Sequence, residues 1–128
     1  VERSRGLGDV YKRQLIGRLG GEEFAVLLPG ADCVTARAVA QRLCEATREI
    51  RIDMNDGAAI CPTLSIGIGC TNMAYPPLGL SALLRMADTA LYQAKASGRD
   101  RYFVAGERPG EADSPAFACE HSGGAKAA

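Results

Sequence analysis

The chain has 128 residues, of which 47% are hydrophobic, and its 15 basic residues balance its 15 acidic ones. This balance leaves no basic stripe for nucleic acid, and no apolar run is long enough to cross a bilayer. We therefore expect no nucleic-acid partner and no membrane contact by this segment. The odd number of cysteines lacks the close spacing of a zinc site and predicts reduced thiols in a cytoplasm, mostly small core residues. They are Cys33, Cys44, Cys61, Cys70 and Cys119.

The first 14 residues, VERSRGLGDVYKRQ, show neither helical nor strand periodicity. They resemble the translated read-through of a sequencing adapter, and the alternative is a genuine disordered arm with a net positive charge. In both cases we expect residues 1–14 to be a non-native or disordered leader outside the fold.

Two strand-like runs, residues 15–19 and 24–28, flank the sequence GGEE. A Gly-Gly pair accepts the positive φ angles of a tight hairpin turn, which places Glu22 and Glu23 just past that turn. Magnesium prefers oxygen ligands and usually bridges one or two carboxylates to substrate phosphates. The glutamates indicate a metal site at a hairpin tip, and charged residues that keep the tip soluble are the alternative for so short a motif.

Asp32 is a candidate N-cap for a helix that runs to about residue 50. The spacing of its apolar residues predicts a buried side made of Ala36, Val39, Ala40, Leu43 and Ile50. Residues 51–62 are rich in turn formers and predict a loop or a short hairpin.

Residues 63–69, TLSIGIG, alternate apolar with small side chains and predict a strand with one buried face. Gly67 and Gly69 in this strand would let another backbone or a ligand come close. A plain core strand is the simpler interpretation.

Within residues 83–101, apolar side chains recur at helical spacing from Leu83 to Ala94 and predict an amphipathic helix that ends near Ser97. Ser81 is a candidate N-cap, and Gly98 is a candidate C′ residue that ends the helix. Lys95 and Arg99 flank this end. The two cations could answer the negative end of the helix dipole, or act as a clamp in which a guanidinium fork and an ammonium group hold a triphosphate.

The C-terminal part begins with residues 101–104, which would close the fold as an edge strand. From residue 106 onward, glycine, alanine, proline and scattered charges follow without any period. Such a composition predicts a disordered tail. His121, the sole histidine, lies in this tail, which excludes a histidine site in the core.

Three motifs, RLGGEEF, TLSIGIG and ADTALYQAKASGRDR, in this order and at these intervals resemble the GGDEF family of diguanylate cyclases. Glu22 replaces the aspartate of the family name. The resemblance implies an α/β fold of the α+β sandwich type, similar to nucleotide cyclases and polymerase palms, with helices packed on an antiparallel-rich central sheet. Residues 15–105 would form a partial GGDEF domain, truncated at its N-terminus. The strand and two helices that precede the hairpin in the family, with a metal-binding Asp and a guanine-reading Asn and Asp, have no counterpart before residue 15.

The resemblance also implies a bacterial signalling enzyme that condenses two GTP molecules into cyclic di-GMP and releases two pyrophosphates. Each GTP would be held by one protomer of a homodimer, assisted by two Mg²⁺ or Mn²⁺ ions per site. The implied site residues either bind the metal and act in catalysis or hold the nucleotide. The first group is Glu22 and Glu23, and the second is Gly20, Gly21, Lys95 and Arg99.

Arg42 aligns with an arginine that some family members use for product inhibition, and a solvated helix-face arginine is the alternative. The inhibitory Arg-x-x-Asp pattern is absent, because its positions hold Tyr11 and Gln14.

The implied location is cytoplasmic, and the sequence leaves open the sensory domain and any membrane anchor of the parent protein. The 128-residue chain alone is expected to be inactive, and the alternative function is a degenerate module that binds GTP, cyclic di-GMP or a protein partner.

Overall fold

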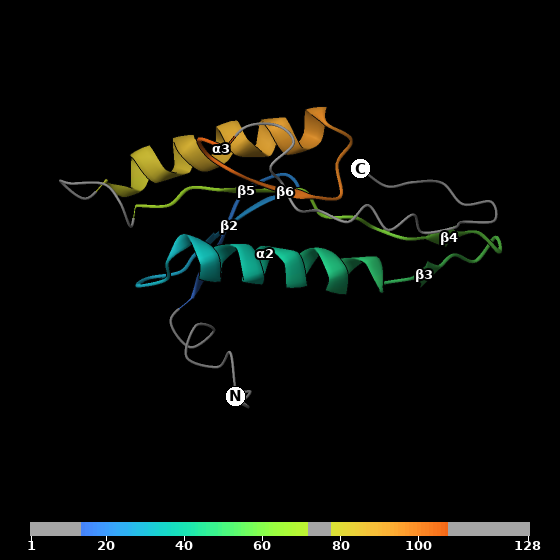
Figure 1. Ribbon diagram of the computed structural model, residues 1–128. Helices are drawn as coiled ribbons and strands as arrows, with labels where there is room; N and C mark the ends of the chain where they lie inside the picture. Colours follow the sequence, from blue (N-terminus) through green and yellow to red (C-terminus); the bar gives the residue numbers. More distant parts are fainter. Residues whose placement is uncertain (1–13, 72–77, 108–128) are drawn as a thin grey trace.

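The computed structural model describes residues 14–71 and 78–107. Most of the expected leader and tail, including Tyr11, Cys119 and His121, lies outside these ranges. The described ranges contain two helices and six strands (Figure 1). In chain order these are β1 (Leu15–Gly20), β2 (Glu23–Leu27), α2 (Cys33–Arg48), β3 (Ile52–Asp53), β4 (Ala59–Ile60), β5 (Ile66–Ile68), α3 (Leu80–Ala96) and β6 (Tyr102–Val104).

The core lies where β5 and β6 pair in parallel between the two helices, with α3 on one face and α2 on the other (Figure 1). Alternate residues of β6 point to opposite faces, as the two-residue period of a strand requires. Tyr102 and Val104 pack in the cluster that contains Ala40 of α2, and Phe103 packs with Ala90 and Ala94 of α3. The expected last strand is therefore confirmed, and all three of its residues are buried.

The strands pair as three separate two-stranded sheets within the described ranges. The β1–β2 and β3–β4 pairs are antiparallel, and the β5–β6 pair is parallel. The mixed α+β class expected from the sequence is confirmed, as is a short hairpin within residues 51–62. The expected central sheet is divided, because neither strand of the β1–β2 hairpin hydrogen-bonds to β5 or β6 in the described part of the chain. The hairpin accordingly exposes large apolar side chains, including 64% of Phe24.

Helix α2 begins as its sequence predicts. The Asp32 side chain caps it by accepting a hydrogen bond from the Thr35 amide at 2.8 Å. Hydrogen bonding from the Thr35 side chain, and then from its amide, stabilises the charged carboxylate and lowers the pKa of Asp32. The helix ends at Arg48, close to the predicted end near residue 50. The predicted burial of Ile50 is wrong, because this residue lies beyond the helix with 47% of its surface exposed. The Ile50 amide instead closes a turn onto the Thr47 carbonyl.

Helix α3 starts one turn earlier than its apolar pattern predicts. Gly79 is the N-cap, and its carbonyl accepts hydrogen bonds from the amides of Ala82 and Leu83. Ser81 therefore lies in the first turn, and its assignment as N-cap is wrong. The predicted C-terminal end is confirmed, because Ser97 is the C-cap and Gly98 follows with a φ of 120°.

The glycines of β5 allow α3 to lie directly against the strand. A Cβ atom at Gly69 would lie 2.5 Å from the carbonyl oxygen of Leu83, and one at Gly67 would overlap the backbone of Ala87 and Leu91. The prediction that another backbone comes close here is confirmed, and that backbone belongs to α3.

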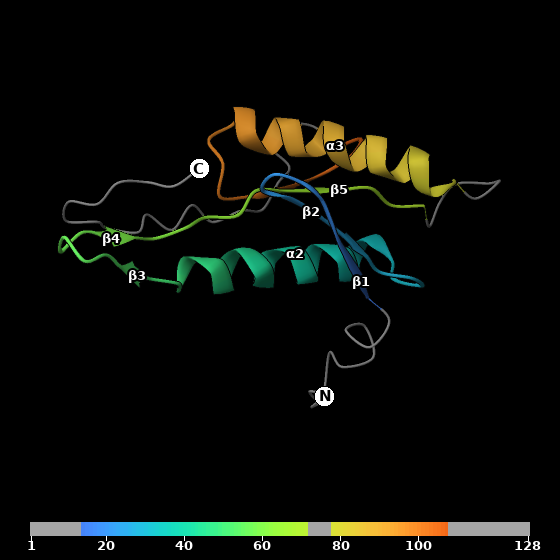
Figure 2. The same ribbon diagram turned by 180° about the vertical axis from the view of Figure 1, so that it is seen from behind.

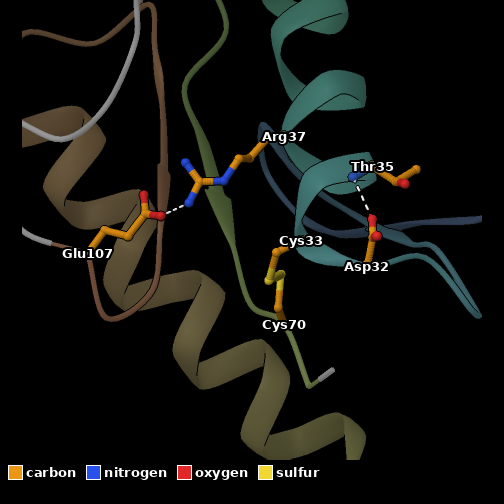
Figure 3. Close-up of a disulfide and its surroundings, with 6 residues drawn as sticks. All are labelled: Asp32, Cys33, Thr35, Arg37, Cys70 and Glu107. Carbon is orange, nitrogen blue, oxygen red and sulfur yellow. Dashed lines mark hydrogen bonds and ion pairs between the residues drawn. A yellow bond between two sulfur atoms is a disulfide. The ribbon is translucent and has the colours of Figure 1, made fainter. Parts of the chain in front are cut away.

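Cys33 and Cys70 form a disulfide that joins the first residue of α2 to the segment after β5 (Figure 3). The expectation of reduced thiols is therefore wrong for these two residues. The two residues are 37 positions apart in the sequence, but their Cα atoms are 5.8 Å apart, a distance that suits a disulfide. Cys44 is a buried core residue as expected, and its burial raises the pKa of the thiol to about 11. Cys61 is also free and half-buried.

A second link lies beside the disulfide. Arg37 of α2 forms an ion pair with Glu107, which follows β6 (Figure 3). The N-terminal half of α2 is thus tied both to the end of β5 and to the end of β6. Neither of the two helices in the described ranges has the length and apolar character needed to cross a membrane.

Reduction of the Cys33–Cys70 disulfide is expected to destabilise the chain by about 2–4 kcal/mol, because the bond limits the entropy of the unfolded state. For a domain of this size, that loss lowers the Tm by roughly 10 °C or more. Thermal melts with and without dithiothreitol measure it. Cys33→Ser should melt at the lower temperature in both buffers, whereas Cys61→Ser should keep the response to reductant. An unchanged Tm on reduction of the unsubstituted chain would contradict this expectation.

Candidate functional site

The tip of the β1–β2 hairpin carries the two adjacent glutamates. The strands are in register from Leu15 opposite Leu27 to Arg18 opposite Phe24, and the register then shifts. Gly21, with a φ of 55°, and Glu22 form the turn itself, and Glu23 is the first residue of β2. Glu22 therefore lies in the turn rather than just past it. Both carboxylates are exposed.

Arg18 holds this turn in place. Its Nε and Nη2 atoms donate hydrogen bonds of 3.1 and 3.0 Å to the carbonyl oxygen of Gly21. The guanidinium fork thus fixes the peptide group that leads directly into Glu22. Arg18 is not among the predicted site residues, and its place at the start of RLGGEEF is the signal that could have pointed to it.

Glu23 lies beside Lys95 near the C-terminal end of α3. The Lys95 Nζ and Glu23 Oε1 atoms are 3.5 Å apart, and the two residues are 72 positions apart in the sequence. Figure 2 shows that the β1–β2 hairpin passes in front of α2 and that its tip lies on the side of α3. So exposed a pair contributes little to stability, on the order of 0–1 kcal/mol. The pair nevertheless places Glu23, a predicted metal ligand, next to Lys95, which is predicted to bind phosphate.

Arg99 and the two glycines complete the predicted set. The Arg99 guanidinium is exposed and has no hydrogen bond or ion pair to any other residue in the described ranges. A Cβ atom at Gly20 or Gly21 would meet nothing within 4 Å, so open space lies beside the hairpin backbone. Both glycines have positive φ angles, of 150° and 55°. The structure therefore brings Glu23 and Lys95 together, with Arg99 four residues past Lys95.

Comparison with known proteins identifies the family of the chain. Residues 8–101 match the family described as "Diguanylate cyclase, GGDEF domain". The chain belongs to the GGDEF family. It is 39% identical over 90 residues to the probable diguanylate cyclase DgcT of Escherichia coli K12, an overlap of 70% of this chain and 20% of DgcT. Diguanylate cyclase A of Treponema denticola is 39% identical over 84 residues, covering 66% of this chain and 22% of that protein.

A third relative of this GGDEF chain is the diguanylate cyclase TpbB of Pseudomonas aeruginosa, 38% identical over 95 residues. The overlap covers 72% of this chain and 21% of TpbB. The chain thus spans about a fifth of the length of these three relatives. The resemblance drawn from the three motifs is confirmed.

The GGDEF hairpin offers two carboxylates as ligands for a divalent ion. The described residues contain no group of three or more His, Cys, Asp or Glu side chains that could hold a metal. The two glutamates supply carboxylate oxygens, which Mg²⁺ prefers, and Mg²⁺ commonly takes only one or two of them and fills its other positions with waters and substrate phosphates. The exposed pair of glutamates, with the Lys95 ammonium group beside Glu23, fits that pattern.

Arg42 lies on the exposed surface of α2 in this GGDEF chain. Its guanidinium has no hydrogen bond or ion pair to another residue within residues 14–71 and 78–107. Its assignment to a product-inhibition site stays a prediction.

Proposed function

We propose that the chain is part of the catalytic domain of a diguanylate cyclase, which condenses two GTP molecules into cyclic di-GMP and releases two pyrophosphates. The contact between Glu23 and Lys95 carries this proposal. It joins a carboxylate suited to a metal and a cation suited to a phosphate, from two elements far apart in the sequence. Homologues named diguanylate cyclase support it.

In the proposed reaction, the 3′-hydroxyl oxygen of one GTP bonds to the α-phosphorus of the other. The bond from that phosphorus to the bridging oxygen of the β-phosphate breaks, and pyrophosphate leaves with the electron pair. Glu23 would accept the hydroxyl proton directly or through a water. Repeating the step with the two nucleotides exchanged closes the ring.

The main task of the hairpin and of the cations near the end of α3 is to hold and orient the triphosphate. Lys95 and Arg99 hold its terminal phosphates, and the open backbone at Gly20 and Gly21 leaves room for the nucleotide. Glu22 and Glu23 would hold two Mg²⁺ or Mn²⁺ ions. When bound, these ions neutralise the charge that develops on the phosphate oxygens.

The proposal places each GTP on one protomer of a homodimer, so that two half-sites face each other during catalysis. The 128-residue chain by itself is expected to make no cyclic di-GMP, and the product would be assayed after incubation with GTP and Mg²⁺. A cytoplasmic location is proposed because the substrate is GTP. The thiol-based reason for that location does not hold for Cys33 and Cys70.

Calorimetric titration of the chain with GTP and with GDP, in the presence of Mg²⁺, tests the phosphate clamp. Lys95→Gln and Arg99→Gln are each expected to weaken GTP binding about 10-fold or more, because each removes a charge-assisted hydrogen bond. GDP, which lacks the terminal phosphate, should be affected much less. Arg85→Gln, a change at an exposed arginine of the same helix, serves as the control. Equal losses for GTP and GDP, or none for either, would count against the clamp.

A further inference from the structure

The turn that carries Arg99 has an unusual backbone. Arg99 and Asp100 have φ angles of 62° and 51°, and they are the only non-glycine residues with positive φ in the described ranges. Side chains with a Cβ atom disfavour this left-handed region, and arginine lacks the short polar group that makes it tolerable for asparagine or aspartate. Such a backbone persists only where its surroundings hold it.

Asp100 is held through all of its hydrogen-bonding groups. Arg48, the last residue of α2, donates from Nε to both carboxylate oxygens at 2.9 Å, and from Nη2 to the Asp100 carbonyl at 3.1 Å. The Asp100 amide donates to the Ser65 hydroxyl at 3.2 Å. Only 14% of the Arg48 side chain and 26% of the Asp100 side chain are exposed, so water screens this pair less than an exposed one.

The backbone of Arg99 is held on both sides as well. Its amide donates to the Ala94 carbonyl at 2.9 Å, which caps the end of α3, and its carbonyl accepts a bond of 2.9 Å from Arg101 Nε. Its guanidinium, in contrast, makes no hydrogen bond or ion pair to the other described residues. The contacts therefore restrain the peptide groups around Arg99 and leave its charged group available for a ligand.

We propose that Arg48 and Ser65 act through Asp100 as positioning residues, which hold the left-handed turn at Arg99 and Asp100 and so direct the Arg99 guanidinium toward the phosphates beside Lys95. This inference rests on the proposed function, because it requires Arg99 to bind phosphate. It gives α2 a part in the site through an ion pair that spans 52 positions of sequence. Lysine cannot replace Arg48 fully, because a single ammonium group does not match the fork that reaches both the carboxylate and the carbonyl.

A double-mutant cycle tests this coupling through GTP affinity in the presence of Mg²⁺, measured by calorimetry on the whole chain. Arg48→Gln should weaken GTP binding about 10-fold, near the loss from Arg99→Gln, and the double variant should lose no more than either single variant. GDP affinity should change little. Arg48→Lys should give an intermediate loss and provides a second reading if Arg48→Gln does not fold. Arg51→Gln breaks the exposed Arg51–Asp53 pair and is the matched control, expected to leave GTP binding unchanged.

Amide hydrogen exchange of Arg99 separates this inference from the proposed function. In Arg48→Gln, the Arg99 amide should exchange faster while amides in the middle of α3 keep their protection. An unchanged Arg99 amide, or additive losses of GTP affinity in the double variant, would overturn the positioning role. If Arg99→Gln binds GTP as tightly as the unsubstituted chain, the phosphate role of Arg99 fails, and the positioning inference is overturned with it even though the turn is held.

Discussion

Glu22→Gln is expected to reduce cyclic di-GMP synthesis by the complete gene product to background. Glutamine keeps the size of the side chain but removes its charge, and a neutral amide is a weak ligand for a hard divalent ion. Loss of the electrostatic stabilisation of the reacting phosphate costs about 100-fold or more in rate. Product formation from GTP, resolved by chromatography, measures the effect in the presence of Mg²⁺ and again with Mn²⁺.

The control for this experiment is Glu49→Gln. Glu49 is an exposed glutamate that follows α2, and its replacement should leave the rate unchanged. Binding of Mn²⁺ to the chain, followed by electron paramagnetic resonance, should weaken in Glu22→Gln and remain unchanged in Glu49→Gln. Undiminished synthesis in Glu22→Gln would remove the metal role from this residue.

Gly67→Ala is expected to prevent the chain from folding cooperatively. A Cβ atom at Gly67 would lie 2.9 Å from the Cα of Leu91 and closer still to the backbone of Ala87. Both neighbours are backbone groups of α3, so no change of rotamer relieves the overlap. An added methylene group in a packed core typically costs about 1–3 kcal/mol of stability, and the loss in Gly67→Ala should be larger. Thermal or urea unfolding, followed by circular dichroism, measures the loss.

Gly17→Ala is the matched control for Gly67→Ala. Both substitutions add one methyl group to a strand glycine, but a Cβ atom at Gly17 would meet nothing within 4 Å. The Gly17 variant should unfold at close to the original midpoint. If Gly67→Ala also retains the original midpoint, α3 does not lie as close to β5 as the structure places it.

Local features were predictable because they depend on neighbours in the sequence. The Asp32 cap needs only an aspartate three positions before a free amide, and the structure contains that bond. The end of α3 near Gly98 follows from the need for a residue that accepts positive φ. The Ser81 cap and the burial of Ile50 were predicted wrongly. Helix boundaries depend on backbone bonds, here those to the carbonyls of Gly79 and Thr47, which side-chain patterns do not reveal.

In the candidate site, some residues could be predicted from the sequence and others could not. The glutamates, Lys95 and Arg99 could be singled out because their chemistry and the three spaced motifs resemble a known family. Arg18, Arg48 and Ser65 could not, since an arginine or a serine in a strand, helix or loop has many ordinary uses. Their roles depend on contacts with Gly21 and Asp100 that no periodicity signals.

By itself, the sequence determined the family, the mixed helix and strand content, the hairpin with its paired carboxylates and the cations at the end of the last helix. These follow from spacing, turn chemistry and side-chain type. Only the tertiary structure decided that Glu23 lies beside Lys95, that Cys33 forms a disulfide with Cys70 and that Arg48 forms an ion pair with Asp100. Each of these pairs is separated by 37 or more residues, and the packing of β5 and β6 between two helices determines which distant residues meet.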